Sequence, residues 1–265
     1  MRHKEVIGVI PCGGHATRIS PLPCSKEILP VGFRSIPDGS IRPKAVSHYL
    51  LEQMQQGGVR KAFFILRKGK WDIPDYYGDG AEFGMDLGYL VTRLPYGPAY
   101  TLDQAYPFVQ RARVAFGYPD ILFGPNDAFE RALDRLTTSR SALVLGLYRI
   151  YNPREWDMVE ADKTGRVHVL HRRLGQTKLK WGVVFAVWTS EFTSFLHEYL
   201  ALPRTAAQQP GTGLPTELTV GDVIQVAIRR GLSAQSVSFA RHTYLDVGTP
   251  EGLQTVATGW SAKNL

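Results

Sequence analysis

Residues 6–18 read VIGVIPCGGHATR, a β-branched apolar run that breaks into a proline, a glycine pair and a basic residue. The run predicts a buried strand, and the glycines predict a loop whose backbone can come close to a ligand. Arg18 and Lys26 place two cations within reach of this loop. Because backbone N–H groups backed by such charges suit a triphosphate, the stretch predicts a nucleotide-binding loop after the first strand.

Two familiar phosphate-binding motifs do not occur in this stretch. A dinucleotide fingerprint needs Gly-x-Gly-x-x-Gly opening a helix, with an acidic residue about 20 positions further on. A P-loop needs Gly-Lys-Ser or Gly-Lys-Thr after four intervening residues. Neither spacing is found here. From the loop alone, a tight glycine turn without a ligand stays an open alternative.

The charge balance of the chain favours small anionic ligands. The 265 residues include 31 Lys and Arg against 24 Asp and Glu, a formal net charge of +7. This excess permits a nucleic-acid partner but equally suits a pocket for anionic small molecules. The basic residues are scattered, apart from the pairs at 172–173 and 229–230 and the cluster at 67–70. We therefore expect small-molecule ligands and no nucleic acid.

The apolar segments are short, which bears on where the protein resides. No apolar run approaches the roughly 18 residues of a membrane span, and the five-residue run before Pro11 is too short for a signal peptide. The two cysteines, Cys12 and Cys24, fit a reducing compartment better than a disulfide framework. We expect a cytoplasmic protein that does not associate with membranes.

Strand-like runs alternate with helix-like stretches along the chain, a pattern typical of βαβ units on a mostly parallel sheet. Strands are predicted at 6–10, 61–66, 86–91, 112–116, 141–148, 166–171, 182–188 and 244–246, with 166–171 and 182–188 as a pair. Helices are predicted at 45–56, 101–109, 129–136, 191–200 and 220–230. A Pro/Gly-rich loop covers 209–215, and no linker divides the chain. We expect one α/β domain over residues 1–265, with a central mixed, mostly parallel sheet flanked by helices.

Several motifs, in order along the chain, resemble those of the sugar-1-phosphate nucleotidylyltransferases. Residues 11–31 contain PCGGHATRI, a proline, Ser-Lys and ILPV. They are similar to the family's Leu-Ala-Gly-Gly-x-Gly-Thr-Arg-Leu, proline, Ser-Lys and Leu-Leu-Pro-Val. Residues 77–80 (YGDG), 117–120 (GYPD) and 244–249 (YLDVGT) resemble its Gly-Asp-Gly, its metal-binding aspartate segment and its Leu-Asp-Thr-Gly-Thr. The resemblance is especially to glucose-1-phosphate thymidylyltransferases and uridylyltransferases, spans nearly the whole chain and implies a Rossmann-like nucleotidyltransferase domain.

The resemblance implies a reaction and a set of site residues. The reaction is transfer of a nucleoside monophosphate from a nucleoside triphosphate to a sugar-1-phosphate or similar phosphate, with release of pyrophosphate. Asp120 and Asp246 would bind Mg²⁺, a cation that prefers oxygen ligands. The implied catalytic residues are Arg18, Lys26 and Arg173. The implied nucleotide contacts are Pro11, Cys12, Gly13, Gly14, His15, Ala16, Thr17, Thr92 and Gly97. The implied acceptor contacts are Asp157, Glu160, Arg172, Trp181 and Gly182.

Some of these residues depart from the family pattern. Ala16 stands where the family has glycine, so a positive φ there would strain the backbone. Thr92 replaces the glutamine that reads the pyrimidine, which leaves the base open. Arg172 replaces the glutamate that reads sugar hydroxyls, and Asp157 replaces a glycine. We expect these two residues either to pair with each other or to recognise a charged acceptor. Trp181 would narrow the acceptor pocket or serve as a core aromatic.

Two alternatives stay open beside this interpretation. A cytidylyltransferase-type enzyme acting on a small phosphate or phosphonate would retain the chemistry and change the acceptor. A nucleotide-binding regulatory protein of the same fold, without turnover, would account for Ala16 and for the replacement at 172–173. Whether the chain forms a homo-oligomer is left open.

Overall fold

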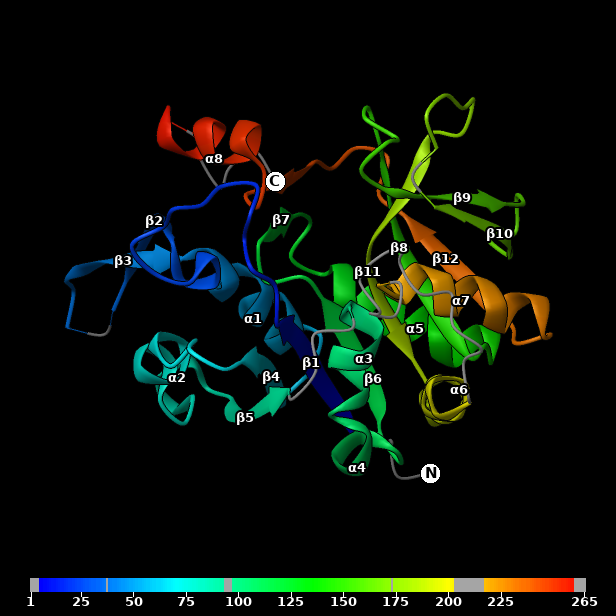
Figure 1. The fold of residues 1–265 in the computed structure, drawn as a ribbon, viewed down its shortest axis with the longest axis horizontal. Helices are drawn as coiled ribbons and strands as arrows, with labels where there is room; N and C mark the ends of the chain where they lie inside the picture. Colours follow the sequence, from blue (N-terminus) through cyan, green and yellow to red (C-terminus); the bar gives the residue numbers. More distant parts are fainter. Residues whose placement is uncertain (1–4, 37, 93–96, 173, 203–216, 260–265) are drawn as a thin grey trace, which may run out of the picture.

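A mixed sheet with helices on both faces forms the body of the protein (Figure 1). The computed structural model describes residues 5–36, 38–92, 97–172, 174–202 and 217–259. In spatial order the strands are β10 (Val167–Arg172), β9 (Asp157–Ala161), β11 (Trp181–Trp188), β6 (Arg113–Gly117), β1 (Val6–Cys12), β4 (Lys61–Arg67) and β5 (Asp86–Thr92). β8 (Leu143–Arg149) pairs with β11 and with β12 (Ala234–Ser238).

The sheet combines a parallel half with strands that run the other way. β6, β1, β4 and β5 are mutually parallel, as crossover connections through helices require. β11 runs antiparallel to β6, β8 and β9. The prediction of a central, mixed, mostly parallel sheet flanked by helices is confirmed.

One predicted strand pairing is wrong. The strands expected at 166–171 and 182–188 correspond to β10 and β11, but β9 lies between them. β9 pairs with β10 along its length and meets β11 where Met158 lies opposite Gly182. The sequence of β9, DMVEA, is too short to show a clear alternation of apolar and polar residues. β10 and β11 follow each other in the chain but are not neighbours in the sheet.

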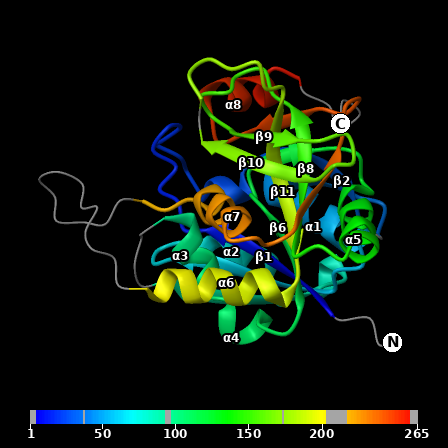
Figure 2. The ribbon, with the colours of Figure 1, turned by 90° about the vertical axis from the view of Figure 1, so that its right-hand side faces the viewer.

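Helices cover the two faces of the sheet, and each face has its own apolar core. α1 (Val46–Gln56), α2 (Asp72–Tyr77) and α5 (Ala128–Ser139) contribute to one core, in which Phe129 is fully buried. α3 (Pro98–Asp103), α4 (Tyr106–Val109), α6 (Ser190–Ala201) and α7 (Val220–Arg229) contribute to the other, around Phe192. Figure 2 shows α7 on one side of β11 and α5 on the other. Each such fully buried side chain stabilises the fold by roughly 1.5–3 kcal/mol.

The helix predicted at 101–109 is divided into α3 and α4. Pro107 lies in the first turn of α4 and has no N–H with which to bond the carbonyl of Asp103. The chain therefore starts a new helix at Tyr106 instead of extending α3. The other predicted helices and strands agree with the structure to within a few residues at their ends.

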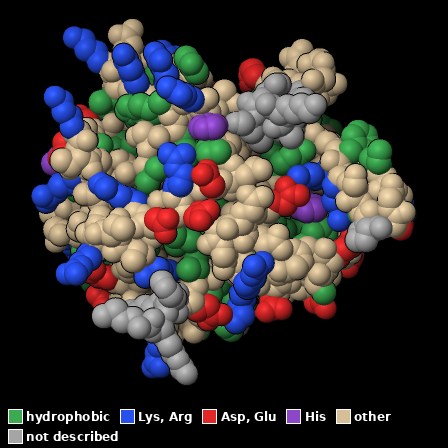
Figure 3. Space-filling view, turned by 180° about the vertical axis from the view of Figure 1, so that it is seen from behind, with side chains coloured by type: hydrophobic (Ala, Val, Ile, Leu, Met, Phe, Trp, Pro, Cys, Tyr) green, Lys and Arg blue, Asp and Glu red, His purple; other side chains and the backbone are tan. Residues whose placement is uncertain are grey.

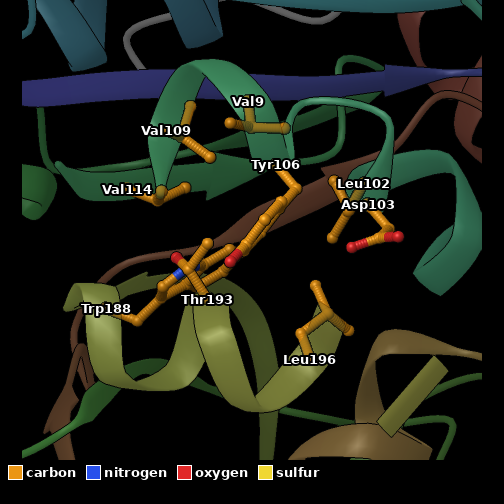
Figure 4. A pocket seen from close by; sticks show the side chains of 9 residues that line it. All are labelled: Val9, Leu102, Asp103, Tyr106, Val109, Val114, Trp188, Thr193 and Leu196. Atoms are coloured by element: carbon orange, nitrogen blue, oxygen red, sulfur yellow. The ribbon is translucent and has the colours of Figure 1, made fainter. Parts of the chain in front are cut away.

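A cavity of about 10 Å³ lies between α4, α6 and the sheet (Figure 4). Its lining residues are Val9, Leu102, Asp103, Tyr106, Val109, Val114, Trp188, Thr193 and Leu196. Beside it, His197 Nδ1 lies 2.9 Å from Asp103 Oδ1, and the imidazole stacks on Tyr106 with 3.7 Å between ring centroids. Because the cavity holds at most about one water, we assign it to the packing of α6 against α3 and α4.

Smaller elements complete the described part of the chain. β2 (Pro30–Ser35) and β3 (Ile41–Ala45) form a hairpin, and β7 (Ile121–Phe123) pairs with β13 (Tyr244–Asp246). Two 3-10 helices, η1 (Lys26–Ile28) and η2 (Ala81–Phe83), and α8 (Pro250–Ala257) make up the rest. Within the described ranges, no helix combines the length and apolar character needed to cross a lipid bilayer. On the rear face, Lys and Arg side chains are interspersed with Asp and Glu (Figure 3).

His48 on α1 is a buried base whose protonation opposes folding. Its side chain is 6% exposed, and burial together with the charges of Lys44 and Arg34 lowers its pKa to about 3. Glu52 Oε1 lies 3.5 Å from His48 Nε2. The ring of Phe83 packs edge-on, with 4.7 Å between centroids.

We expect acid to destabilise the protein partly through this histidine. An unfolded histidine titrates near pH 6.5, so between about pH 6.5 and pH 3 the unfolded chain binds a proton that the folded chain does not. The free energy of unfolding should therefore fall by about 2 kcal/mol more in the wild type than in His48→Gln between pH 7 and pH 4.5. Urea unfolding of both proteins at the two pH values measures the difference, and equal losses would contradict the prediction.

Candidate active site

Two carboxylates meet where β7 and β13 pair. Asp246 ends β13 opposite Ile121, so Asp120, which precedes β7, is its neighbour across the pair. A Cβ atom on Gly248 would lie 2.2 Å from Asp120 Oδ2 and 3.0 Å from Asp246 Oδ1. The two acidic groups therefore converge on a space that is open because residue 248 has no side chain.

Each carboxylate has a cationic neighbour. Lys26 Nζ lies 2.5 Å from Asp120 Oδ2, and Arg18 Nη2 lies 3.4 Å from Asp246 Oδ2. Lys26 is held in η1, whereas the side chain of Arg18 is 51% exposed. The structure thus gathers four charged residues that the sequence placed in three separate motifs.

The pKa values of the two carboxyl groups shift in opposite directions. Burial and the charge of Asp120 raise the pKa of Asp246 to about 6, against the charge of Arg18 and a 2.8 Å hydrogen bond from the amide of Gly248. Burial also acts to raise the pKa of Asp120, but the charge and hydrogen bond of Lys26 outweigh it and lower that pKa. A nearby cation would lower the free energy of the doubly ionised pair.

The donor set fits a hard divalent cation. The described residues contain no group of three or more His, Cys, Asp or Glu that could hold a metal ion. Mg²⁺, however, keeps several waters and usually binds through one or two carboxylates together with substrate phosphates. Asp120 and Asp246 offer two oxygen ligands that converge beside Gly248. The residues present therefore fit such an ion.

The glycine loop begins at the C-terminal edge of the parallel strands, where α/β sheets place their ligands. Pro11 and Cys12 close β1, and Cys12 is fully buried with a free thiol whose pKa burial raises. Residues 13–17 follow, and Ala16 has a φ of 54°. This is the left-handed conformation, which costs a non-glycine residue roughly 1–2 kcal/mol. The alanine therefore strains the loop at the position where the family has glycine.

Replacing Ala16 with glycine should relieve this strain. We expect Ala16→Gly to raise the free energy of unfolding by about 1 kcal/mol, because glycine adopts a positive φ without the Cβ clash. Urea unfolding of the variant against the wild type measures the change. Ala132→Gly is a control at an alanine in the interior of α5, where glycine should destabilise by about 1 kcal/mol or more. Destabilisation by both changes would contradict the prediction.

The predicted base contacts are partly described. Thr92 ends β5 and is 9% exposed, while residues 93–96 lie outside the described part of the chain. Gly97 has a φ of +102°, and a Cβ there would lie 2.6 Å from Glu217 Cγ and 2.7 Å from the carbonyl oxygen of Leu218. Close packing and a positive φ are therefore sufficient reasons for glycine at position 97, whether or not a nucleotide base binds there.

Arg172 pairs with a residue that was not predicted. Its Nη1 lies 3.2 Å from Asp222 Oδ2, in the first turn of α7, whereas the expected partner was either Asp157 or a charged acceptor. Asp157 lies opposite Arg172 in the register of β9 and β10. A Cβ atom on Gly221 would lie 2.0 Å from Asp157 Oδ2. Arg172 forms its ion pair with Asp222 because the start of α7 packs against β10, and recognition of a charged acceptor by Arg172 and Asp157 stays a prediction.

The other predicted acceptor contacts have clear structural partners. Glu160 Oε1 lies 2.8 Å from His171 Nε2 on the neighbouring strand. Trp181 packs against the apolar core around Phe192, in line with the alternative of a core aromatic. A Cβ on Gly182 would lie 2.5 Å from Ile150 Cγ1. Arg173 lies outside the described residues.

Sequence reasoning missed two residues that shape this site. Gly248 has no side chain and so leaves the space between the carboxylates open. Its place in the Leu-Asp-x-Gly-Thr motif could have pointed to this role. Asp222 joins Arg172 to α7 and also forms a capping box with Thr219. The Thr-x-x-Asp spacing signals the cap, but nothing local signals the ion pair.

Comparisons with known proteins give the class of the fold. No protein-family model matches the chain. A putative glucose-1-phosphate thymidylyltransferase from Bacillus anthracis, in complex with a sucrose, superposes with a TM-score of 0.78 and 19% identity over 96% of this chain and 94% of that one. A UDP-glucose pyrophosphorylase complexed with UDP-glucose gives 0.73 and 14%, over 96% and 97%. The chain therefore has the nucleotidyltransferase fold.

The curated proteins of similar sequence are named as nucleotidyltransferases. The glucose-1-phosphate thymidylyltransferase of Neisseria gonorrhoeae is 24% identical over 254 residues, which cover 95% of this chain and 81% of the relative. That of Mycolicibacterium smegmatis is 25% identical over 252 residues, 93% and 79% of the two chains. The low-salt glycan biosynthesis nucleotidyltransferase Agl11 of Haloferax volcanii is 23% identical over 254 residues, 93% and 63%. Over most of its length, and at low identity, the chain is therefore similar to sugar-1-phosphate nucleotidyltransferases.

Proposed function

We propose that the protein transfers a nucleoside monophosphate from a nucleoside triphosphate to a sugar-1-phosphate or a sugar-like phosphate and releases pyrophosphate. The observation that carries the proposal is the meeting of Arg18, Lys26, Asp120 and Asp246 beside the glycine loop. The names of the relatives, glucose-1-phosphate thymidylyltransferases among them, support this reaction class and a place in sugar-nucleotide biosynthesis.

The proposed reaction is an in-line displacement. An oxygen of the acceptor phosphate forms a bond to the α-phosphorus while the bond to the bridging oxygen of the β-phosphate breaks, and the electron pair of that bond leaves with pyrophosphate. The step needs no covalent enzyme intermediate, so positioning and charge neutralisation supply most of the catalysis. Lys26 would contact phosphate oxygens near the α-phosphorus, and Arg18 would stabilise the departing pyrophosphate.

Asp120 and Asp246 would hold a divalent cation, for which we propose Mg²⁺. When bound, such a cation neutralises phosphate charge. Burial keeps bulk water away from Asp120, which is 5% exposed, and Lys26 maintains its ionised form. Gly248 keeps the space between the two carboxylates open.

Pyrophosphate release by the purified protein tests the proposal. The panel combines dTTP, UTP, CTP and ATP with glucose-1-phosphate, other hexose-1-phosphates and small phosphate or phosphonate acceptors, with and without Mg²⁺. We expect release that requires a triphosphate, an acceptor and the cation, with the nucleotide-sugar product identified by mass spectrometry. Nucleotide binding without release from any pair would contradict the proposal and favour the regulatory alternative.

One observation favours the small-acceptor alternative. Asp157 occupies a position that is glycine in the family, and its carboxylate closes against Gly221 at the start of α7. The side chain fills space beside the expected acceptor site, and Arg172 brings the opposite charge from the adjacent strand. If pyrophosphate appears with CTP and a small phosphate or phosphonate but not with any hexose-1-phosphate, the cytidylyltransferase-type reaction is the correct one.

A further inference from the structure

A pocket of about 290 Å³ lies between the glycine loop and the segment that follows β4. β1 and β4 are parallel neighbours with Cys12 opposite Leu66, so their following residues leave the same edge of the sheet side by side. Residues 14–16 line the pocket on one side, Lys26 and the residues before it on another, and Arg67, Gly69, Lys70 and Asp72 on a third. The basic cluster at 67–70, which lies outside the motifs quoted above at 11–31, 77–80, 117–120 and 244–249, thus faces the predicted nucleotide loop.

Two contacts fix this wall of the pocket against Lys26. Lys70 Nζ lies 2.5 Å from Glu27 Oε1, and both side chains are almost completely buried. Asp72 accepts hydrogen bonds of 2.7 Å from the backbone amide and from the hydroxyl of Ser25. Since Ser25 and Glu27 are the residues on either side of Lys26, the segment after β4 and Lys26 have a defined relative position.

Arg67 differs from the other two cations that line the pocket. Lys26 and Lys70 each lie 2.5 Å from a carboxylate oxygen. Among the described residues, the hydrogen bonds of Arg67 go to carbonyl oxygens, that of Gly14 at 3.4 Å and that of Lys68 at 3.3 Å. Within the described ranges Arg67 therefore forms no ion pair with a carboxylate, and a guanidinium with N–H donors to spare suits phosphate oxygens.

We propose that Arg67 binds phosphate, and that this pocket takes the β- and γ-phosphates of the nucleoside triphosphate and then the released pyrophosphate. The inference rests on the proposed function for the identity of the ligand. Lys26 belongs both to the pocket and to the carboxylate pair, so a triphosphate with its α-phosphate at Lys26 would extend its terminal phosphates toward Arg67. Arg67 adds a cation on the leaving-group side of the reaction.

Equilibrium binding of inorganic pyrophosphate, measured by titration calorimetry, tests the proposal without turnover. The variants are Arg67→Ala, Arg67→Lys and, as a matched control, Lys68→Ala, which removes the same charge from an exposed neighbour that does not line the pocket. We expect Arg67→Ala to weaken binding of pyrophosphate and nucleoside triphosphate about tenfold and Arg67→Lys to weaken it less. Lys68→Ala should stay within about twofold of the wild type, and nucleoside monophosphate should bind all variants equally.

Two results would overturn the assignment. Equal pyrophosphate affinity of Arg67→Ala and Lys68→Ala would remove Arg67 from the site, and weaker monophosphate binding by Arg67→Ala would make its role structural. In turnover assays, Arg67→Ala should raise the KM for the triphosphate about tenfold with kcat nearly unchanged. If the wild type binds pyrophosphate through Arg67 but never releases it from a triphosphate, the site stands and the nucleotidyl-transfer proposal fails.

Discussion

Replacing Asp120 with asparagine is expected to lower kcat/KM for pyrophosphate release by about 10³-fold. Asparagine keeps the shape of the side chain but removes its negative charge. Lys26 contacts that carboxylate at 2.5 Å, and the carboxylate lies beside that of Asp246 in the space next to Gly248. Asp246→Asn should cost a similar factor, since either change leaves one carboxylate. Both effects follow from the proposed binding of a divalent cation and are measured by steady-state kinetics.

The control and the double variant make this prediction specific. Asp134→Asn removes a charge of the same kind from an exposed position on α5 and should leave kcat/KM within about twofold. Asp120→Asn combined with Asp246→Asn should lose little more than either single change, because residues that act as a unit are not additive. A loss below tenfold in the single variants, or strictly multiplicative losses in the double variant, would argue against a shared cation site.

Features that depend only on residues adjacent in the chain could be predicted from local sequence patterns. The run before Pro11 is β1, and the glycine pair lies in the loop that follows it, as the residue types alone predict. Asp120 and Asp246 are 126 positions apart, and no local pattern connects them. Both were predicted because each lies in a motif that resembles one of the family. Ala16 was singled out because the resembling motif has glycine at that position. Its positive φ shows why glycine suits that position.

Other features depend on packing between distant segments and could not be predicted from local patterns. The β7–β13 pair that joins the carboxylates has three residues per strand, too few for a periodic signal. Arg172 meets Asp222 because α7 packs on β10, and an ion-pair partner 50 positions away leaves no trace in local periodicity. The basic cluster at 67–70 was visible, but its role depends on the register of β4 beside β1.

Lys26→Met is expected to lower kcat by roughly 10²–10³-fold, because it removes the ammonium group placed to contact phosphate near the α-phosphorus. Burial acts to lower the pKa of Lys26, but the charge and hydrogen bond of Asp120 outweigh it and raise that pKa, so the ammonium stays charged at neutral pH. Lys61→Met, at an exposed ion pair with Glu5, is the control and should leave kcat within about twofold.

The same change should also destabilise the fold. Without its partner, the buried Asp120 carboxylate is uncompensated, and we expect Lys26→Met to lower the free energy of unfolding by roughly 3 kcal/mol at pH 7. Adding Asp120→Asn removes that buried charge and should restore most of the stability while activity stays lost. Urea unfolding and pyrophosphate release of the single and double variants measure both effects. An unchanged free energy of unfolding in Lys26→Met would contradict the stabilising role of Lys26, and recovery of activity in the double variant would contradict the proposed roles of both Lys26 and Asp120.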